Sequence, residues 1–211
     1  MRIPRPLTIL SLSFALLVFC SAAFADSSFD FSTDGNINAT SVTFNGTAGA
    51  SITLNGFSNT ASTTSTFPTD LWYKNGGAGE TGIGLKDDPT GENEIAGTNF
   101  VEFTDKGITS ITLGSVQSGE KYALYGSNTL GTLGTHLIAS GTGNDATISG
   151  LEALDSGYTY LSLIDPGTGN ILLANATYAP VPEPGTTTLL MTLGVVGLLA
   201  FGRRKLGKLA A

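Results

Sequence analysis

The sequence has 211 residues, enough for one domain of ordinary size with targeting segments at its ends. Its 28 glycines and low charge content (13% of residues), with many Thr, Ser and Asn, predict an all-β chain rich in turns and argue against a helical protein. Residues 26–180 hold sixteen acidic residues and four lysines, a net charge of −12, so we expect no nucleic acid partner and no attraction to anionic lipid surfaces.

The first 25 residues have the three parts of a secretory signal peptide. Arg2 and Arg5 supply the positive end, residues 7–19 form an apolar run, and Ala23-Phe24-Ala25 is a small-x-small cleavage site. The apolar run is shorter than the roughly 20 residues that a membrane-spanning helix needs. We therefore expect the general secretion machinery to export the chain and signal peptidase to cut it before Asp26.

The single cysteine, Cys20, lies inside this leader. A lipoprotein leader with Cys20 as the lipid-bearing residue is the alternative, but the bulky Phe19 stands where lipoprotein processing requires a small residue. The signal-peptide interpretation is therefore favoured. Residues 26–179 then contain no thiol, so disulfides contribute nothing and the domain depends on its hydrophobic core.

Residues 26–179 contain a succession of short predicted strands separated by glycine-rich turns. Polar and apolar residues alternate in Ser41-Val42-Thr43-Phe44 and Ser51-Ile52-Thr53-Leu54, the pattern of half-buried strands, and Asn45-Gly46 and Asn55-Gly56 follow as turn signals. Similar patterns predict strands at residues 99–103, 110–113, 121–125, 135–138, 147–148, 158–164 and 170–173. About ten to twelve strands, with no clean helical repeat, predict an all-β fold, either a β-sandwich or a jelly roll.

Two connections between these strands have a distinct composition. The run of Ser, Asn and Thr at residues 55–66 is too polar for the core and predicts a mobile loop or a sheet edge. The sequence Asp-Pro-Gly-Thr-Gly-Asn at residues 165–170 predicts a hairpin or another loop connection.

The acidic segment, residues 87–94, is the one concentration of candidate metal ligands. Asp87, Asp88, Glu92 and Glu94 place four carboxylates within eight residues of a turn-rich loop. Calcium takes about six to eight oxygen ligands, so the segment is a candidate calcium site, although its spacing does not match an EF-hand. The favoured interpretation is a solvated loop that keeps the domain soluble and guards a strand edge, with no bound cofactor.

Aromatic residues offer a second kind of candidate site. Trp72 and Tyr73 lie beside a Lys-Asn-Gly-Gly turn and could form a platform for the face of a sugar. Four tyrosines on two further predicted strands could add to it: Tyr122, Tyr125, Tyr158 and Tyr160. Aromatic residues at this spacing pack in cores or in cross-strand pairs more often, so a packing role is the favoured interpretation.

The sequence does not indicate an enzyme. His136 is the sole histidine, and no Gly-x-Ser-x-Gly elbow accompanies it. Residues 26–179 also lack a cysteine nucleophile, a histidine-rich metal set and a phosphate-binding glycine loop. Paired carboxylates for glycoside hydrolysis need only be neighbours in space, so an enzyme acting on matrix polysaccharide stays open as the least favoured alternative.

Residues 180–211 form the most specific pattern in the chain. Pro182-Glu183-Pro184 precedes an apolar helix predicted at residues 186–202, and Arg203-Arg204-Lys205 opens the basic tail 203–211. An apolar helix that ends in a basic cluster stops in the membrane with that cluster on the cytoplasmic side. A helix of this length spans about 25 Å, which suits a thin or locally compressed bilayer.

These three parts, in this order, closely resemble the PEP-CTERM sorting signal of Gram-negative bacteria. The resemblance implies that an exosortase, a membrane-embedded cysteine protease, recognises the chain near Pro182-Glu183-Pro184 and removes the helix. The protein would then be held transiently in the inner membrane and passed to the cell surface or the exopolysaccharide matrix. The alternative is a plain C-terminal anchor that is retained, with the prolines as a stiff spacer.

A weaker resemblance covers most of the domain between the two signals. Gly82-Ile83-Gly84-Leu85, Asn93-Glu94-Ile95 and Phe100-Val101-Glu102-Phe103 are similar to a pattern found in ectodomains attached to PEP-CTERM tails. Those ectodomains are similar to β-sandwiches, so the resemblance implies the same fold here.

The expected organisation is a signal peptide at 1–25, a β-sandwich ectodomain at 26–179 and a PEP-CTERM sorting signal at 180–211. We expect a non-enzymatic surface or matrix protein that contacts exopolysaccharide. A carbohydrate- or calcium-binding module with a defined site is the alternative.

Overall fold

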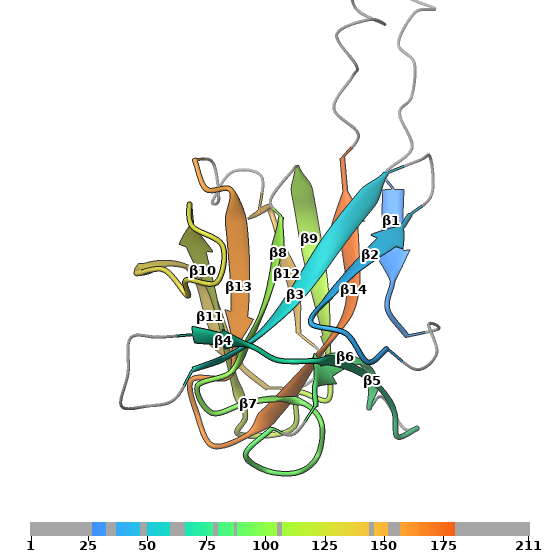
Figure 1. The fold of residues 1–211 in the computed structure, drawn as a ribbon, viewed down its shortest axis with the longest axis vertical. Helices are drawn as coiled ribbons and strands as arrows, with labels where there is room; N and C mark the ends of the chain where they lie inside the picture. Colours follow the sequence, from blue (N-terminus) through green and yellow to red (C-terminus); the bar gives the residue numbers. More distant parts are fainter. Residues whose placement is uncertain are drawn as a thin grey trace, which may run out of the picture. The chain divides into compact units, whose positions relative to one another are not determined.

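The computed structural model describes residues 27–32, 37–46, 50–59, 66–77, 80–86, 88–104, 107–143, 146–151 and 157–179. They form two antiparallel sheets packed face to face, so the predicted all-β sandwich is confirmed (Figure 1). Across these ranges, no helix has the length and apolar character needed to cross a membrane. The predicted signal peptide 1–25 and transmembrane helix 186–202 lie outside the described residues.

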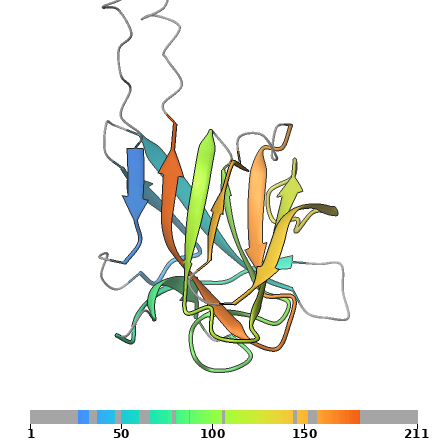
Figure 2. The ribbon, with the colours of Figure 1, turned by 180° about the vertical axis from the view of Figure 1, so that it is seen from behind.

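The first sheet, the β14 sheet, is built around the last strand, β14 (Asn170–Tyr178). Its order is β12 (Thr147–Ser149), β9 (Ile108–Gly114), β14, β6 (Thr81–Leu85) and β5 (Leu71–Asn75), and both β1 (Ser27–Asp30) and β7 (Ile95–Ala96) also pair with β14. Ser27 of β1 pairs with Tyr178 of β14, so the first and last strands lie side by side (Figure 2).

The second sheet, the β10 sheet, has the order β11 (His136–Thr142), β10 (Lys121–Ser127), β13 (Tyr160–Ile164), β8 (Phe100–Thr104), β3 (Ser51–Asn59) and β2 (Ser41–Asn45), with β4 (Thr66–Pro68) paired to β3. β2 and β3 form a hairpin in which the N–H of Gly46 donates to the carbonyl of Ala50 at 2.9 Å. The predicted turn at Asn45-Gly46 is therefore confirmed. β11 forms one edge of this sheet.

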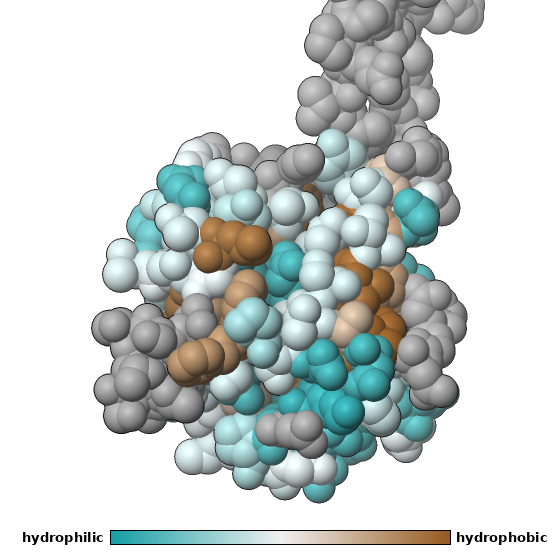
Figure 3. Space-filling view, viewed as in Figure 1, coloured by the Kyte–Doolittle hydropathy of each residue, from teal (hydrophilic) through white to brown (hydrophobic). Residues whose placement is uncertain are grey.

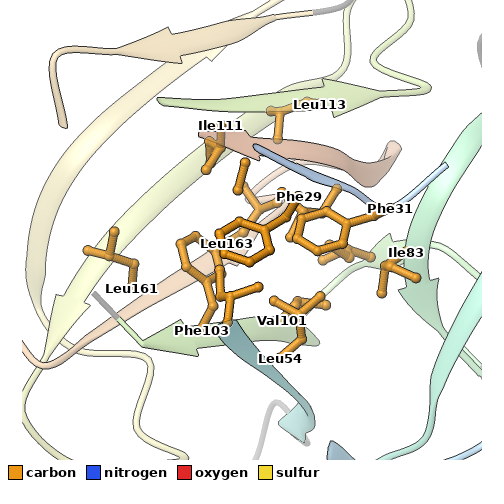
Figure 4. Packing of buried hydrophobic residues seen from close by; sticks show 14 of the residues in the cluster. Phe29, Phe31, Leu54, Ile83, Val101, Phe103, Ile111, Leu113, Leu161 and Leu163 are labelled. Atoms are coloured by element: carbon orange, nitrogen blue, oxygen red, sulfur yellow. The ribbon is translucent and has the colours of Figure 1, made fainter. Parts of the chain in front are cut away.

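The hydrophobic core lies between the two sheets. Successive side chains of a strand point to opposite faces, so Val101 and Phe103 of β8 face inward together. Figure 4 shows them meeting side chains from both sheets and from the first strand: Phe29, Phe31, Leu54, Ile83, Ile111, Leu113, Leu161 and Leu163. Burial of each large apolar side chain contributes about 1.5–3 kcal/mol, which lets the fold form without disulfides.

A smaller apolar cluster, the outer cluster, lies on the other face of the β10 sheet. Its buried members are Phe57, Phe100, Ala123 and Ile164, and Tyr125 and Leu133 pack against them. Leu133 belongs to the connection between β10 and β11, so that connection folds back over the sheet. Seen from the side on which β3 lies in front, separate apolar patches interrupt a mostly polar surface (Figure 3).

One predicted connection differs in the structure, and the other takes one of its two predicted forms. Asn55-Gly56 is not a turn but part of β3, and the run at residues 55–66 is strand as far as Asn59. A Cβ atom on Gly56 would overlap the carbonyl oxygen of Thr69, so this glycine admits a neighbouring backbone within a strand. The segment at residues 165–170 is a loop, not a hairpin, because the strands it joins belong to different sheets.

Candidate functional site

The acidic segment lies against the outer face of β5 and β6. Tyr73 and Ile83 of these strands face the core, so their neighbours Lys74 and Gly84 face outward. A Cβ atom on Gly84 would overlap the carbonyl oxygen of Asn93 and would lie 2.6 Å from the Cα atom of the next residue. The loop backbone therefore rests directly on β6, in a space that only glycine leaves open.

Asp88 shapes this loop. Its buried Oδ1 atom accepts hydrogen bonds from the backbone N–H groups of Thr90 at 2.6 Å and Gly91 at 3.1 Å, and Oδ2 accepts the N–H of Glu94 at 2.9 Å. The prediction of a solvated loop is therefore wrong for Asp88 and Glu94, which are both buried, and holds for Glu92, whose side chain is 60% exposed. The reason is local: a carboxylate that accepts several turn N–H groups is held inside the turn.

Glu94 and Lys74 form the centre of an ion cluster. The Lys74 ammonium contacts Glu94 Oε1 directly and lies 3.5 Å from a carboxylate oxygen of both Glu80 and Glu92. Ser115 Oγ donates to Glu94 Oε1 at 3.2 Å, while the buried Glu94 Oε2 has no hydrogen-bond partner among the described residues. Burial raises the pKa of Glu94 by more than Lys74 lowers it. Burial lowers the pKa of Lys74, but Glu94 and Glu80 together raise it above its ordinary value.

The geometry of this cluster bears on the candidate calcium ligands. Within the described ranges, no three His, Cys, Asp or Glu side chains are grouped so that they could hold a metal ion. The ammonium of Lys74 already lies among the carboxylates of Glu80, Glu92 and Glu94. The fourth candidate, Asp87, lies outside the described residues, so calcium binding stays a prediction.

Trp72 and Tyr73 do not form a shared aromatic platform on β5. Trp72 and Tyr73 are consecutive strand residues and point to opposite faces. Tyr73 packs against the core and donates its hydroxyl to the carbonyl of Ser32, so its packing role is confirmed. His136 likewise packs against an aromatic ring, stacked on Tyr158 with ring centroids 5.2 Å apart.

An open groove of about 320 Å³ lies instead at the β11 edge of the β10 sheet. Its lining consists of Lys121, Tyr122, Ala123, Tyr125, Leu137, Ser140, Gly141, Thr142 and Pro166. Across the two strands Lys121 pairs with Thr142, Ala123 with Ser140, and Tyr125 with Leu137, with a register shift that keeps Leu137 and Ser140 on one face. Aromatic carbon beside a few hydroxyl groups is the composition of a small-molecule site.

A buried carboxylate, Asp165, fixes the Pro166 wall of this groove. Asp165 is fully buried, and its Oδ1 accepts the N–H of Gly167 at 2.6 Å across the turn that contains Pro166. Glu120 holds the same turn by accepting the N–H of Asn170 at 3.3 Å. Burial raises the pKa of Asp165 against the opposing effect of the Gly167 N–H, and Glu120 adds to the rise.

Glu102 is a second fully buried carboxyl, on the outer face of β8. Both its oxygens accept the N–H of Gly131 at 3.2 Å, and Ser162 Oγ donates to one of them at 3.4 Å. Gly131 belongs to the connection between β10 and β11, so Glu102 fastens that connection to the sheet. Burial raises the pKa of Glu102 to about 7, against the opposing effect of these hydrogen bonds.

Replacing Glu102 by glutamine is expected to remove one source of pH-dependent stability. The pKa of this carboxyl is about 7 in the folded chain against an ordinary 4.5, so the folded state keeps a proton that the unfolded state loses. The free energy of unfolding of the wild type therefore falls as pH rises through that interval. Glutamine does not titrate, so the stability of Glu102→Gln relative to the wild type should increase between about pH 5 and 8, by up to about 3 kcal/mol. Urea unfolding of both proteins across this range measures the gain. A constant difference at every pH would contradict it.

Sequence reasoning singled out two residues of the groove, Tyr122 and Tyr125, as aromatic candidates, but did not single out its other lining residues or the buried Glu102 and Asp165. Glu102 could have been recognised in the sequence, because it is an acidic residue inside the apolar run Phe100-Val101-Glu102-Phe103. Ser140 and Thr142 could not, since hydroxyl residues occur throughout the chain.

The predicted targeting residues lie outside the described part of the chain. They are the cleavage residues Ala23 and Ala25, the motif Pro182, Glu183 and Pro184, and the basic cluster Arg203, Arg204 and Lys205. Their individual roles stay predictions.

The C-terminal segment was also compared with known protein families. A family model described as the PEP-CTERM protein-sorting motif matches residues 180–205. The matched range contains the Pro-Glu-Pro motif, the predicted apolar helix and the basic cluster, so the resemblance seen in the sequence is confirmed. No curated protein matches the chain. The chain therefore carries a PEP-CTERM protein-sorting motif at its C-terminal end, next to an all-β sandwich, and such a signal implies export through the membrane to the cell surface.

Proposed function

We propose that the chain is a non-enzymatic surface or matrix protein that associates with exopolysaccharide after an exosortase has removed its C-terminal helix. The observation that carries this proposal is the sorting motif at residues 180–205. Only Ala179 separates that motif from β14, the central strand of its sheet. A folded domain is thus joined directly to a signal for transient membrane retention and release.

The order of the tail residues explains how the signal would work. The helix at 186–202 holds the chain in the inner membrane, and Arg203-Arg204-Lys205 fixes its orientation with the basic end in the cytoplasm. Pro182 and Pro184 keep the segment between domain and helix extended, because proline fixes φ and disfavours helix at the preceding residue. Glu183 is then presented to the protease in an extended chain at the outer face of the membrane.

The roles of the ionisable groups support a domain without catalysis. The Asp88 carboxylate holds its own loop, Glu94 pairs with Lys74, and Glu102 fastens the β10–β11 connection. His136, the sole histidine, stacks on Tyr158. Each group has a structural role where it lies, so an enzyme acting on matrix polysaccharide remains the least favoured function.

Processing can be tested by the mass of the mature protein in cells with and without the exosortase. We expect the wild-type product to begin at Asp26 and to lack the helix, and the product from protease-deficient cells to retain it. Glu183→Ala should accumulate uncut in protease-positive cells, because recognition is lost while insertion is unchanged. Thr187→Ala, outside the Pro-Glu-Pro motif, is the matched control and should be cut normally. Equal masses that both include the helix would identify an ordinary anchor and refute the sorting role.

The structure favours one of the alternative functions, a carbohydrate-binding module. The groove at the β11 edge combines two tyrosines with hydroxyl side chains on the surface of the domain. Calcium binding has less support, because both oxygens of Asp88 already accept hydrogen bonds and Oε1 of Glu94 is paired with Lys74.

A further inference from the structure

We propose that the groove on β10 and β11 binds a neutral hexose unit of a polysaccharide. This inference rests on the proposed association with exopolysaccharide and gives that association a location and a ligand class. Four features of the groove lead to it: its size, its chemistry, its charge and the rigidity of its walls.

The size of the groove suits a sugar unit. Its volume of about 320 Å³ lies at the lower end of small-molecule sites, which run from about 300 to 1,000 Å³. The groove is open along the surface at a sheet edge, so a polymer can enter with one unit held and its neighbours outside. A closed pocket of the same volume would admit only a free small molecule.

The chemistry of the groove matches the two kinds of surface on a hexose ring. Tyr125 and Leu137 pair across the strands and present apolar carbon, to which the C–H face of a sugar can pack. Ser140 and Thr142 provide hydroxyl groups that both donate and accept hydrogen bonds, as sugar hydroxyls require. The Tyr125 ring packs on the outer cluster, so it is held in place before a ligand arrives.

The charge of the groove favours a neutral ligand. Lys121 is the one charged residue among those that line it. Its charge is partly offset by the nearby Asp165, whose pKa it lowers. Because residues 26–180 carry a net charge of −12, a polyanionic chain is repelled as it approaches. The Lys121 ammonium therefore acts as a hydrogen-bond donor to a hydroxyl group and not as an anion receptor.

The walls of the groove are fixed by buried contacts. Asp165 and the N–H of Gly167 hold the turn that carries Pro166, and the Lys121 side chain lies beside the same glycine, 3.6 Å from where a Cβ atom would stand. At Gly141 the Tyr122 ring occupies the space where a side chain would lie. A preformed site loses little ordering entropy on binding, which lets a shallow groove hold a sugar.

The test measures binding of purified exopolysaccharide from the producing cells, together with panels of neutral and uronate-containing oligosaccharides, to the complete β-sandwich. Tyr125→Ala removes the aromatic surface, and Ser140→Trp fills the groove while leaving Tyr125 and its packing in place. Both variants should weaken binding of neutral glycans by about tenfold or more, as loss of a central aromatic contact does. Phe67→Ala is the matched control: Phe67 is 54% exposed on β4, in the same sheet but outside the groove, and its loss should leave affinity unchanged.

Each outcome decides a different point. Wild-type binding with unchanged affinity in Tyr125→Ala and Ser140→Trp would overturn the groove as the site and leave the proposed function standing. Absence of binding by the wild type would overturn both. Tighter binding of uronate-containing than of neutral glycans, lost in both groove variants, would keep the location and overturn the ligand class.

Discussion

A valine at position 84 is expected to displace the acidic segment and to destabilise the domain by about 3 kcal/mol. The atoms that a Cβ on Gly84 would meet are the backbone of Asn93 and Glu94, which cannot rotate away as a flexible side chain can. The loop must lift from β6, and Glu94 then leaves Lys74. Urea unfolding of the purified domain, with and without Gly84→Val, measures the loss.

Gly157 is the matched control for this substitution. It is also a glycine, with a φ of 116°, and no atom of the described residues lies within 4 Å of the place where its Cβ would stand. Gly157→Ala should therefore cost only about 1 kcal/mol, from backbone conformation alone. A Gly84→Val protein that is no less stable than Gly157→Ala would show that the loop does not rest on β6.

Replacing Lys74 by methionine is expected to have the second large effect. The free energy of unfolding should fall by about 3 kcal/mol at pH 8. Methionine keeps much of the apolar stem but removes the one cation that, within the described part of the chain, contacts the buried Glu94. Glu80 and Glu92 then repel Glu94 without compensation. Because the pKa of Glu94 is already raised by burial, it rises further without the lysine.

The pH dependence gives this prediction its sharpest test. Protonation of Glu94 removes the uncompensated charge. The loss of unfolding free energy in Lys74→Met should therefore be largest well above the raised pKa of Glu94 and should shrink as pH falls. The double variant Lys74→Met/Glu94→Gln should recover most of the loss at pH 8. Lys86→Met is the control, because Lys86 makes an exposed hydrogen bond to Asn38 and its loss should cost below about 1 kcal/mol. A deficit that is equal at pH 5 and pH 8 would contradict the buried-charge account.

The fold could be predicted where each strand carries its own alternating pattern. β2, the first half of β3, β8 and β10 were predicted from such patterns and are strands in the structure. β6 was not predicted because Gly82 and Gly84 replace its outward side chains, and the absence of a side chain at Gly84 is what lets the acidic segment pack on it. Asn55-Gly56 gave a turn signal, but only the Thr69 backbone, which is distant in sequence, explains a glycine inside β3.

The candidate site could be predicted only where its residues are consecutive in the sequence. The sorting motif occupies consecutive residues, and the family match at 180–205 agrees with it. The carboxyls of the domain have partners far along the chain: Glu94 contacts Lys74 across 20 positions, and Glu102 reaches Gly131 across 29. Sequence showed the acids but not which of them would be buried, because burial depends on strands that meet only after folding.

The position of β14 has a consequence for the timing of export. β14 is the last described strand of the chain, yet β1, β6, β7 and β9 all pair with it, so the β14 sheet cannot close until Tyr178 is available. On the proposed export route, nearly the whole domain would therefore cross the membrane before its fold could be completed. The apolar helix predicted at residues 186–202 would stop translocation a few residues later and hold the chain at the membrane while the final strand inserts. Retention by the predicted tail would thus give folding a place and an interval in which to finish, and release would follow delivery of the central strand.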